Sequence, residues 1–331
     1  MRHQNTLFHD LLKLVPWQRF ERYVEELGSD ARVRRLSTKS QFIALLHAQL
    51  TGAESLREIE TTLASQQSRL YHLGARAPAR STLSDANLRR PCALFAALFD
   101  DLLRQARPGL RRTLREAAYL IDATTVQLNV LSQAWARDKT RDGAAAKMHI
   151  VYDVSRGVPV HFDVTPVRTN EVSIAKAMHI EEGATYVFDM GYYDFGLWAR
   201  MHAAGCRFVT RLKRHTKADD IIEDRHVASG GAIKSVRLIG VTRRMKASRQ
   251  NPLKDITLRE IEVVIETGKT LRLVTNDLTS DATTIADLYK ARWQIELFFK
   301  WVKQNLKIRR FLGTSENAVR TQIAVALIAF M

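Results

Sequence analysis

Cysteine is scarce in this sequence, and long apolar runs are absent from it. The two cysteines among 331 residues, Cys92 and Cys206, form no Cys-x-x-Cys pair or Cys/His cluster, which excludes a disulfide framework and a zinc knuckle. No window approaches the roughly 20 uncharged apolar residues of a membrane helix, and the best stretch, residues 323–331, is short. The N-terminus is amphipathic and lacks the apolar segment of a secretion signal. We therefore expect a protein of the reducing cytoplasm, with no membrane partner.

Acidic residues are in deficit as well. The chain carries 51 Lys and Arg against 35 Asp and Glu, which gives a formal net charge of +16 and a pI near 10.1. The basic residues recur in clusters along the whole chain: Arg32, Arg34 and Arg35; Arg111, Arg112 and Arg115; Lys213 and Arg214; Arg243, Arg244 and Lys246; Arg309 and Arg310. Each neutralised phosphate of a nucleic acid releases counterions. The distribution favours a duplex that crosses several domains, although a single cluster can be merely a solvated surface.

The length allows two or three domains, and the first one is expected to be all-helical. Over residues 1–112, which end in a basic connector, apolar residues recur at spacings of three and four. One helix is expected to begin at SLREI, residues 55–59, and another at STLSDAN, residues 81–87, with Ser81 as its N-cap.

Basic and amide side chains are expected to project from or near the second of these helices: Arg80, Asn87, Arg89 and Arg90. In a helix-turn-helix this helix would enter a major groove, and Asn87, Arg89 and Arg90 would contact bases. The alternative is a basic, solvated helix of an ordinary bundle, because the two helices are farther apart in sequence than in the compact motif. Both interpretations stay open.

Residues 113–331 are expected to form a second domain, so the predicted fold is multi-domain, α plus α/β. Strands are predicted at residues 117–122, 147–154 and 158–165, then a helix at 170–179, a strand at 185–189, a helix at 195–204 and a strand at 206–212. This βββαβαβ order is that of a ribonuclease-H-like sheet. We interpret the β-rich residues 213–276 as an insertion rather than as more of the same sheet. A single long helix is expected over residues 281–306, and another from about residue 315.

Two aspartates follow apolar strands of this second domain. Asp122 ends the first strand, in LIDATT, and Asp189 ends a later one, in VFDMGYYD. Ligand sites of open α/β sheets lie beyond the carboxyl ends of the strands. One such aspartate is more often a cap, but two at matching positions favour binding of Mg²⁺ or Mn²⁺. Asp153, Asp163 and Asp194 are rival carboxylates, and we expect Asp194 to be a capping or supporting acid.

A third carboxylate lies in the long helix. Tyr289, Arg292, Glu296 and Lys303 are separated by three, four and seven residues, and at 3.6 residues per turn these steps keep all four on one face. A surface helix laced with charge shows similar intervals. The combination of a tyrosine and both signs of charge with two upstream strand-end aspartates favours a functional face.

The segments LIDATT, VFDMGYYD and YKARWQIELFFKWVK resemble the three signature regions of DDE transposases of the insertion-sequence-four family. The helix fits that family's Tyr-x2-Arg-x3-Glu-x6-Lys signature at every fixed position, and SLREIE and STLSDAN resemble its N-terminal module. The resemblance implies a metal-binding catalytic triad of Asp122, Asp189 and Glu296. It also implies three residues that hold DNA near the cleaved end: Tyr289, Arg292 and Lys303.

The implied activity is that of a bacterial insertion-sequence transposase. Such an enzyme binds the terminal inverted repeats, cleaves at the element ends with water and joins the freed 3′-hydroxyl to target DNA. Two Mg²⁺ or Mn²⁺ ions per active site, about 3.5–4 Å apart, activate the nucleophile and stabilise the leaving oxygen, so that no covalent protein nucleophile is needed. A homodimer in a synaptic complex with double-stranded DNA, near the bacterial nucleoid, is expected because two element ends are paired.

Weaker candidates and rival functions accompany this expectation. Lys147 and His149 begin a strand beside the expected site and could contact phosphate, although a strand-edge lysine and a hydrogen-bonded core histidine are both common. The sequence reaches Met331 inside an apolar helical pattern where family members usually continue. An inactive, C-terminally truncated remnant that binds DNA without cleaving it is therefore one alternative, and a structure-specific nuclease on the same fold is another.

Overall fold

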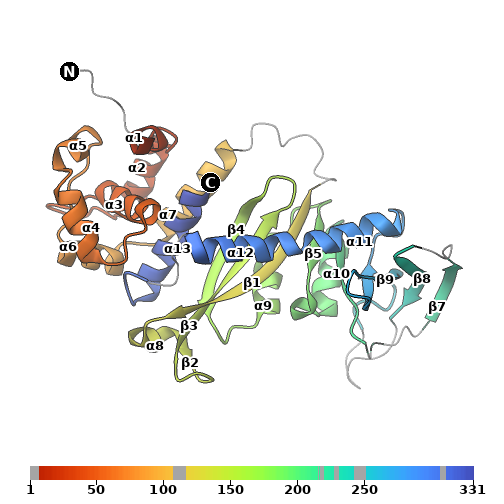
Figure 1. Ribbon diagram of the computed structural model, residues 1–331. Helices are drawn as coiled ribbons and strands as arrows, with labels where there is room; N and C mark the ends of the chain where they lie inside the picture. Colours follow the sequence, from red (N-terminus) through yellow and green to blue (C-terminus); the bar gives the residue numbers. More distant parts are fainter. Residues whose placement is uncertain are drawn as a thin grey trace.

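The computed structural model describes residues 7–106, 117–214, 216, 220–226, 231–241, 251–305 and 311–331. Its N-terminal part is helical, as the sequence predicts, and a mixed sheet with flanking helices follows (Figure 1). The N-terminal helices are α1 (Leu7–Leu12), α2 (Trp17–Glu26), α3 (Thr38–Thr51), α4 (Leu56–Ala64), α5 (Gln67–His72), α6 (Arg80–Arg89) and α7 (Ala93–Gln105). The expected basic clusters at residues 111–115, 243–246 and 309–310 lie outside the described residues.

The start of α4 agrees with the sequence prediction, and the start of α6 does not. Ser55 Oγ accepts a hydrogen bond from the backbone N–H of Glu58 at 3.1 Å, and Glu58 Oε2 accepts one from the N–H of Glu54 at 2.8 Å. This reciprocal pair is a capping box. The N-cap expected at Ser81 is wrong, because α6 already begins at Arg80 and no side chain caps it. Ser81 is instead an exposed residue of the first turn.

Helix α13 (Glu316–Phe330) packs against α3, α6 and α7 of the N-terminal part (Figure 1). Asn317 in its first turn donates hydrogen bonds to the carbonyls of Asn87 at 2.8 Å and Arg90 at 2.6 Å, and it accepts one from the backbone N–H of Cys92 at 3.0 Å. Residues 316–330, which the sequence division assigns to the second domain, therefore lie in space with the helical module. None of the helices in the described ranges combines the length and the apolar character needed to cross a membrane.

The sheet contains the strands that the sequence predicts, in the predicted order. The strands are β1 (Ala118–Leu128), β2 (Arg137–Asp138), β3 (Gly143–Asp153), β4 (Val158–Pro166), β5 (Thr185–Phe188), β6 (Arg207–Arg211), β7 (Asp220–His226), β8 (Ile233–Gly240), β9 (Leu258–Val264) and β10 (Thr270–Thr275). β1, β3 and β4 form the expected antiparallel meander, to which the short β2 is added. β5 pairs with β1 in parallel, and β6 pairs with β5 in parallel.

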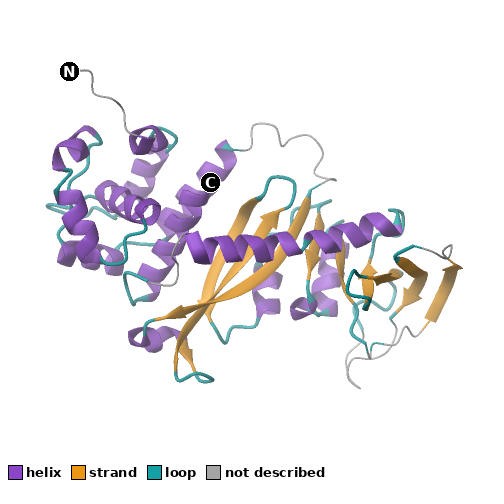
Figure 2. Cartoon of the chain, viewed as in Figure 1, coloured by secondary structure: helices purple, strands orange, loops and turns teal. Residues whose placement is uncertain are grey.

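The strands described within residues 213–276 continue this sheet, so the expectation that this stretch is not more of the same sheet is wrong. The strand order is β2-β3-β1-β5-β6-β10-β9-β8-β7, with β4 beside β3 (Figure 2). β10 joins the edge of β6 in antiparallel fashion, where Leu273 faces Arg211. This pairing satisfies backbone groups of β6 that would otherwise form an open edge. Alternation along a strand reveals a half-buried strand but not its partner, so the sequence did not show the connection.

The two faces of the sheet carry separate apolar cores. Tyr119 and Ile121 of β1 belong to the core under α9 (Glu171–Ala177) and α10 (Phe195–Ala203). Leu120, between them in sequence, belongs to the core shared with α11 (Ala282–Ala291) and α12 (Trp293–Asn305). Because side chains alternate along a strand, Asp122 and Thr124 lie on the α12 face. Short helical pieces complete the fold: η2 (Val130–Ser132), α8 (Gln133–Ala136) and η3 (Met190–Tyr192).

The long helix expected over residues 281–306 is two helices that meet at Arg292. The backbone N–H of Arg292 bonds to the carbonyl of Tyr289, and the N–H of Ile295 bonds to the carbonyl of Arg292, each at 3.2 Å. These are bonds to the third residue back, whereas an α-helix bonds to the fourth. The helices still run nearly end to end across the sheet (Figure 1). The local tightening places Arg292 at the junction.

Candidate active site

Asp122 and Asp189 are adjacent at the end of the parallel ladder between β1 and β5. The last pair in this ladder is Ile121 with Phe188, so each aspartate is the next residue of its chain segment. The two segments enter the ladder in the same direction, and their carboxylates therefore emerge at one edge. The sequence argument for two matching aspartates is thus supported by the register of the strands.

The backbone around the two aspartates differs. The expectation that Asp122 ends its strand is wrong, because β1 continues to Leu128 with Asp122 opposite Ile150 of β3. β1 still pairs with antiparallel β3 beyond the point where its pairing with parallel β5 ends, so Asp122 lies within an extended strand. Asp189 follows its strand, as expected, and its Oδ1 accepts a hydrogen bond from the N–H of Gly191 at 2.7 Å.

Arg292 connects the sheet to the helix that carries Glu296. Its Nη2 donates a hydrogen bond to Glu296 Oε1 at 2.6 Å, and its Nη1 lies 3.8 Å from Asp122 Oδ2. The guanidinium also lies over the ring of Tyr289, 5.9 Å from the ring centroid. The side chains of Arg292 and Asp122 are only 17% and 18% exposed, so these charges interact with little screening by water.

Lys303 reaches the same strand two turns farther along α12. Its Nζ donates a hydrogen bond to Thr124 Oγ1 at 2.5 Å. A groove of about 440 Å³ opens here between β1 and α12, and Asp122, Glu296 and Lys300 line it together with Thr124 and Lys303. The predicted face of the helix therefore does meet the sheet, and it borders a space that is open to solvent.

The pKa of Asp122 reflects burial first and the neighbouring negative charges second. Burial raises the pKa of Asp122, and the charges of Asp189 and Glu296 raise it further, to about 6, against the lowering effect of the Ala123 N–H and of Arg292. Burial would lower the pKa of Arg292, but the hydrogen bond to Glu296 and the surrounding negative charges raise it above its ordinary value. Carboxylates that disfavour one another's ionised forms are stabilised by an added cation.

Comparison with known families decides the identity. Residues 113–331 match the family model described as the transposase DDE domain. The chain belongs to the DDE transposase family. Residues 3–76 of this transposase match a second family model, which is described as a domain of unknown function, DUF4372.

Curated relatives of this transposase are themselves named as transposases. The protein y4zB of Sinorhizobium fredii is 41% identical over 254 residues, which cover 76% of this chain and 70% of y4zB. The protein named for the insertion sequence element IS5377 of Geobacillus stearothermophilus is 25% identical over 256 residues, 76% of this chain and 65% of that protein. The protein named for IS4SA of Synechocystis sp. is 23% identical over 256 residues, 76% of this chain and 70% of that protein.

One solved structure also aligns with most of the transposase. It is the piggyBac transposase synaptic complex with hairpin DNA, which superposes with a TM-score of 0.44 and 9% sequence identity over 97% of this chain and 71% of that chain. A likeness at this level supports no conclusion about the present site.

The DDE transposase domain implies dependence on divalent metal ions in general. The donor chemistry fits, because Asp122, Asp189 and Glu296 offer the hard carboxylate oxygens that Mg²⁺ and Mn²⁺ prefer. The raised pKa of Asp122 agrees with a site that gains from added positive charge. In the part of the chain that the structure describes, however, no three acidic, histidine or cysteine side chains converge closely enough to hold one ion. Glu296 is directed at Arg292 instead.

The two weaker candidates on β3 have partners within the transposase domain. Lys147 Nζ forms an ion pair with Glu171 Oε1 at 2.7 Å. His149 is buried, its Nε2 lies 2.8 Å from Thr165 Oγ1, and burial lowers its pKa. His149 is thus a hydrogen-bonded core residue, the alternative that the sequence left open, and Lys147 is turned towards α9.

Asn87 and Arg90 do not project from α6, which corrects the expectation for them. Both are buried, at 4% and 7% exposure. Arg90 donates hydrogen bonds to the carbonyl of Leu36 and to Gln41 Oε1, the latter at 3.0 Å, and Gln41 Nε2 donates to Asn87 Oδ1 at 2.8 Å. Arg89 is exposed, as expected. Since α5 also separates α4 from α6, no compact helix-turn-helix is formed by these elements.

Sequence reasoning missed two charged residues near the site. Lys300 lines the groove one turn beyond Glu296, and a four-residue step along the same helix could have identified it. Glu171 is close to Asp189: a Cβ added at Gly191 would lie 2.9 Å from both Asp189 Oδ1 and Glu171 Oε2. Glycine at position 191 therefore lets the two carboxylates approach. No sequence signal marks Glu171, which begins α9 far from the signature segments.

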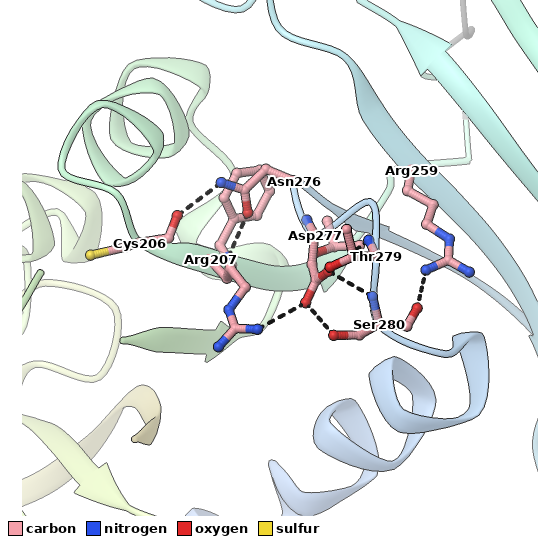
Figure 3. A network of polar contacts seen from close by, with 9 residues as sticks. Cys206, Arg207, Arg259, Asn276, Asp277, Thr279 and Ser280 are labelled. Carbon is pink, nitrogen blue, oxygen red and sulfur yellow. Dashed lines mark hydrogen bonds and ion pairs between the residues drawn. The ribbon is translucent and has the colours of Figure 1, made fainter. Parts of the chain in front are cut away.

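A turn around the buried Asp277 anchors the start of α11, the helix that precedes the one carrying Glu296. Asp277, between β10 and α11, accepts hydrogen bonds from the backbone N–H groups of Thr279 at 3.0 Å and Ser280 at 2.9 Å and from Ser280 Oγ at 2.6 Å (Figure 3). It also pairs with Arg207 of β6 at 3.3 Å. Burial would raise the pKa of Asp277, but these hydrogen bonds hold it at about 2. The turn ties the start of α11 to the sheet.

The rival carboxylates have structural partners. Asp153 Oδ1 accepts a hydrogen bond from Ser155 Oγ at 2.7 Å, and Asp163 pairs with Arg320 of α13 at 3.0 Å. Asp194 caps α10 by accepting a hydrogen bond from the N–H of Leu197 at 2.7 Å, as the sequence predicted. None of these three aspartates lines the groove between β1 and α12.

Proposed function

We propose that this protein is a transposase of the insertion-sequence-four type, with the Tyr-Arg-Glu-Lys signature, that cleaves the ends of a bacterial insertion sequence and joins them to target DNA. One observation carries the proposal. Arg292 bonds to Glu296 of α12 and lies beside Asp122 of β1, so two of the family's acidic positions meet although they are far apart in sequence. Asp189 is the next residue in register with Asp122.

The strand order supports a ribonuclease-H-like catalytic domain. An antiparallel meander of β4, β3 and β1 is followed by the parallel strands β5 and β6. In this proposal β7 to β10 are an elaboration that extends the sheet beyond β6. The catalytic carboxylates then come from the central strands and from the helix across them.

Asp122, Asp189 and Glu296 are the residues that would hold two Mg²⁺ or Mn²⁺ ions. Two such ions lower the pKa of an attacking water or 3′-hydroxyl and stabilise the leaving oxygen of the phosphodiester. Asp122 is held within strand β1, and the hydrogen bond from the N–H of Gly191 orients one oxygen of Asp189. Arg292 Nη2 donates to Oε1 of Glu296 at 2.6 Å, so in the triad Glu296 would offer a metal ion its second oxygen, Oε2.

The basic side chains of the groove orient the DNA. Lys303, anchored on Thr124, presents an ammonium group beside the carboxylates, and Lys300 adds a second one. Arg292 can turn its planar fork from Glu296 to a phosphate, which it binds with two parallel hydrogen bonds. Tyr289 is almost fully buried beneath Arg292, and it acts by positioning that side chain. Two copies of the chain pair the two terminal inverted repeats in a homodimeric synaptic complex.

A cleavage and joining assay tests the proposal. The full chain is incubated with a duplex that carries the flanking element end, a target plasmid and Mn²⁺ or Mg²⁺. Cut ends that become joined to the target support a transposase. Cut ends without joining would indicate a nuclease, and binding without products would indicate a remnant that binds DNA only. Either of these two results overturns the proposal.

A further inference from the structure

A basic groove lies on the helical module, apart from the catalytic groove. It has a volume of about 860 Å³ and is formed by the segment of residues 27–36 and by one side of α6. Arg32, Arg34 and Arg35 line it from the segment, and Arg89 lines it from the helix. The segment and α6 are separated by α3, α4 and α5 in sequence, so the fold alone gathers these four arginines.

The four guanidinium groups are available to a ligand. All four residues are exposed, and in the described part of the chain none of their side chains makes an ion pair or a hydrogen bond. Among the residues that line the groove, Asp85 is the one carboxylate. The groove therefore has an excess of positive charge, with four exposed arginines against one carboxylate.

A partly buried polar network links the two walls of the groove. Asp30 Oδ1 accepts hydrogen bonds from the backbone N–H and the hydroxyl of Thr38 at the start of α3, at 2.8 and 2.7 Å. Arg90, at the end of α6, pairs with Asp30 at 3.4 Å and donates to the carbonyl of Leu36. The buried Arg90 thus fastens the segment to α6. The exposed arginines are therefore carried by two segments that the buried Arg90 connects.

The backbone of the segment supports a role beyond connection. Arg32 has a φ of 62°, in the left-handed region that is costly for a residue with a Cβ. Such strain persists where surrounding contacts over-determine it and is often associated with binding sites. Here it places the Arg32 side chain at the groove.

We propose that this groove binds the phosphate backbone of double-stranded DNA. Residues 3–76, which match the domain of unknown function, would supply the wall with Arg32, Arg34 and Arg35, and α6, outside that match, would supply Arg89. Guanidinium forks match phosphate oxygens, and phosphate contacts fix the register of a protein on a duplex without reading its sequence. The inference rests on the proposed function because DNA is the partner. It differs from the sequence expectation of base contacts by Asn87, Arg89 and Arg90. Here the exposed arginines contact the phosphates, and the buried Asn87 and Arg90 hold the walls of the groove together.

Equilibrium binding of the full chain in EDTA tests the groove independently of cleavage. Two duplexes of equal length, one carrying the element end and one unrelated, are titrated at several salt concentrations. The variant combines Arg34→Ala, Arg35→Ala and Arg89→Ala, and the matched control combines Arg22→Ala, Arg69→Ala and Arg76→Ala, three exposed arginines of the same module outside the groove. Arg32 is kept because substitution there would also change backbone strain.

The groove variant is expected to lose roughly tenfold in affinity per arginine near 0.1 M salt, by the same factor for both duplexes. The slope of log affinity against log salt should fall by about 0.9 per arginine. The control should keep most of the affinity, and both variants should melt like the parent because all substituted side chains are exposed. An unchanged salt slope in the groove variant overturns the proposal. Loss confined to the element-end duplex does so too, since it would indicate base recognition.

Two further results separate this inference from the proposed function. If the groove substitutions weaken the binding of polyglutamate but leave the affinity for DNA unchanged, the groove binds acidic protein and the proposal is wrong. If the parent binds DNA through the groove but never cleaves it with Mn²⁺, the groove stands and the proposed function fails.

Discussion

Arg292 donates a hydrogen bond to Glu296 at 2.6 Å across one helical turn, at the point where α11 and α12 meet. The tightened backbone at this junction puts the guanidinium between the helix and Asp122 of β1. A single side chain thus connects two carboxylates whose elements are about 170 residues apart. Arg292 places a positive charge beside both carboxylates, so it competes electrostatically with a bound cation, and in the proposed function it also contacts DNA.

Arg292→Ala is expected to change cation binding and cleavage in opposite directions. Removal of a positive charge beside Asp122 and Glu296 should raise the affinity for Mn²⁺ about five- to tenfold, on the order of 1 kcal/mol. Cleavage should fall at least about tenfold because the phosphate loses a donor. Titration calorimetry and single-turnover cleavage measure the two effects. Lys290→Ala, which removes an exposed cation nearby on α11, is the matched control. A fall in Mn²⁺ affinity in Arg292→Ala would contradict this account.

Lys300→Ala and Lys303→Ala should both impair cleavage, since both residues line the groove between β1 and α12 that we propose to be catalytic. We expect a loss of about tenfold for Lys300→Ala and a larger one for Lys303→Ala, because Lys303 is also anchored on Thr124. Single-turnover rates at saturating DNA provide the measurement, and Lys254→Ala, an exposed lysine beside Asp255, is the control. Equal rates for Lys300→Ala and the parent would remove Lys300 from the site.

Ser55→Ala and Ser81→Ala should differ although both serines begin helical motifs in the sequence. Ser55 caps α4, so Ser55→Ala should lower the free energy of unfolding by about 1 kcal/mol. Ser81 is exposed within α6 and caps nothing, so its replacement should stay within about 0.5 kcal/mol. Urea unfolding of the two variants decides the matter. Equal destabilisation would show that α6 starts at Ser81 after all.

The Asp277 turn should make a pH-dependent contribution to stability. Its pKa is lowered from 3.8 to about 2 in the folded chain, so the ionised form stabilises the fold at every pH above about 4. The contribution is about 2 kcal/mol there, and it is lost as the pH falls through 2. The difference in unfolding free energy between the parent and Asp277→Ala should therefore be constant near neutrality and narrow below pH 4. A difference that widens on acidification would contradict the assignment.

The sequence predicted the parts of the site that depend on local geometry. The spacing of Tyr289, Arg292, Glu296 and Lys303 fixes a common face because a helix has a known pitch, and a one-residue junction at Arg292 does not rotate it away. The two aspartates also lie at matching positions as expected, because two parallel strands paired in register bring their following residues to the same edge of the sheet. Both inferences need only a few residues of regular structure.

Long-range packing was not accessible in this way. Asn87 and Arg90 look like surface residues of a basic helix, and their burial depends on Gln41 of α3 and on Asn317 of α13, more than 200 residues away. The junction of β10 with β6 likewise joins strands with a long β-rich stretch between them. Hydrophobic alternation is the same whether a strand extends an existing sheet or starts another. The pairing partner of β10 therefore becomes known only from the folded structure.

Asp122, Asp189 and Glu296 are predicted to act as one catalytic set. Single-turnover cleavage of the element end in Mn²⁺ should be compared for Asp122→Asn, Asp189→Asn and Glu296→Gln, with Asp163→Asn as a control carboxylate that pairs with Arg320 instead. Each of the three isosteric variants is predicted to lose cleavage by at least a hundredfold while it still binds the duplex in EDTA, and Asp163→Asn is predicted to cleave like the parent. Cleavage at the parental rate by any one of the three would contradict the assignment of that carboxylate and, with it, the shared site.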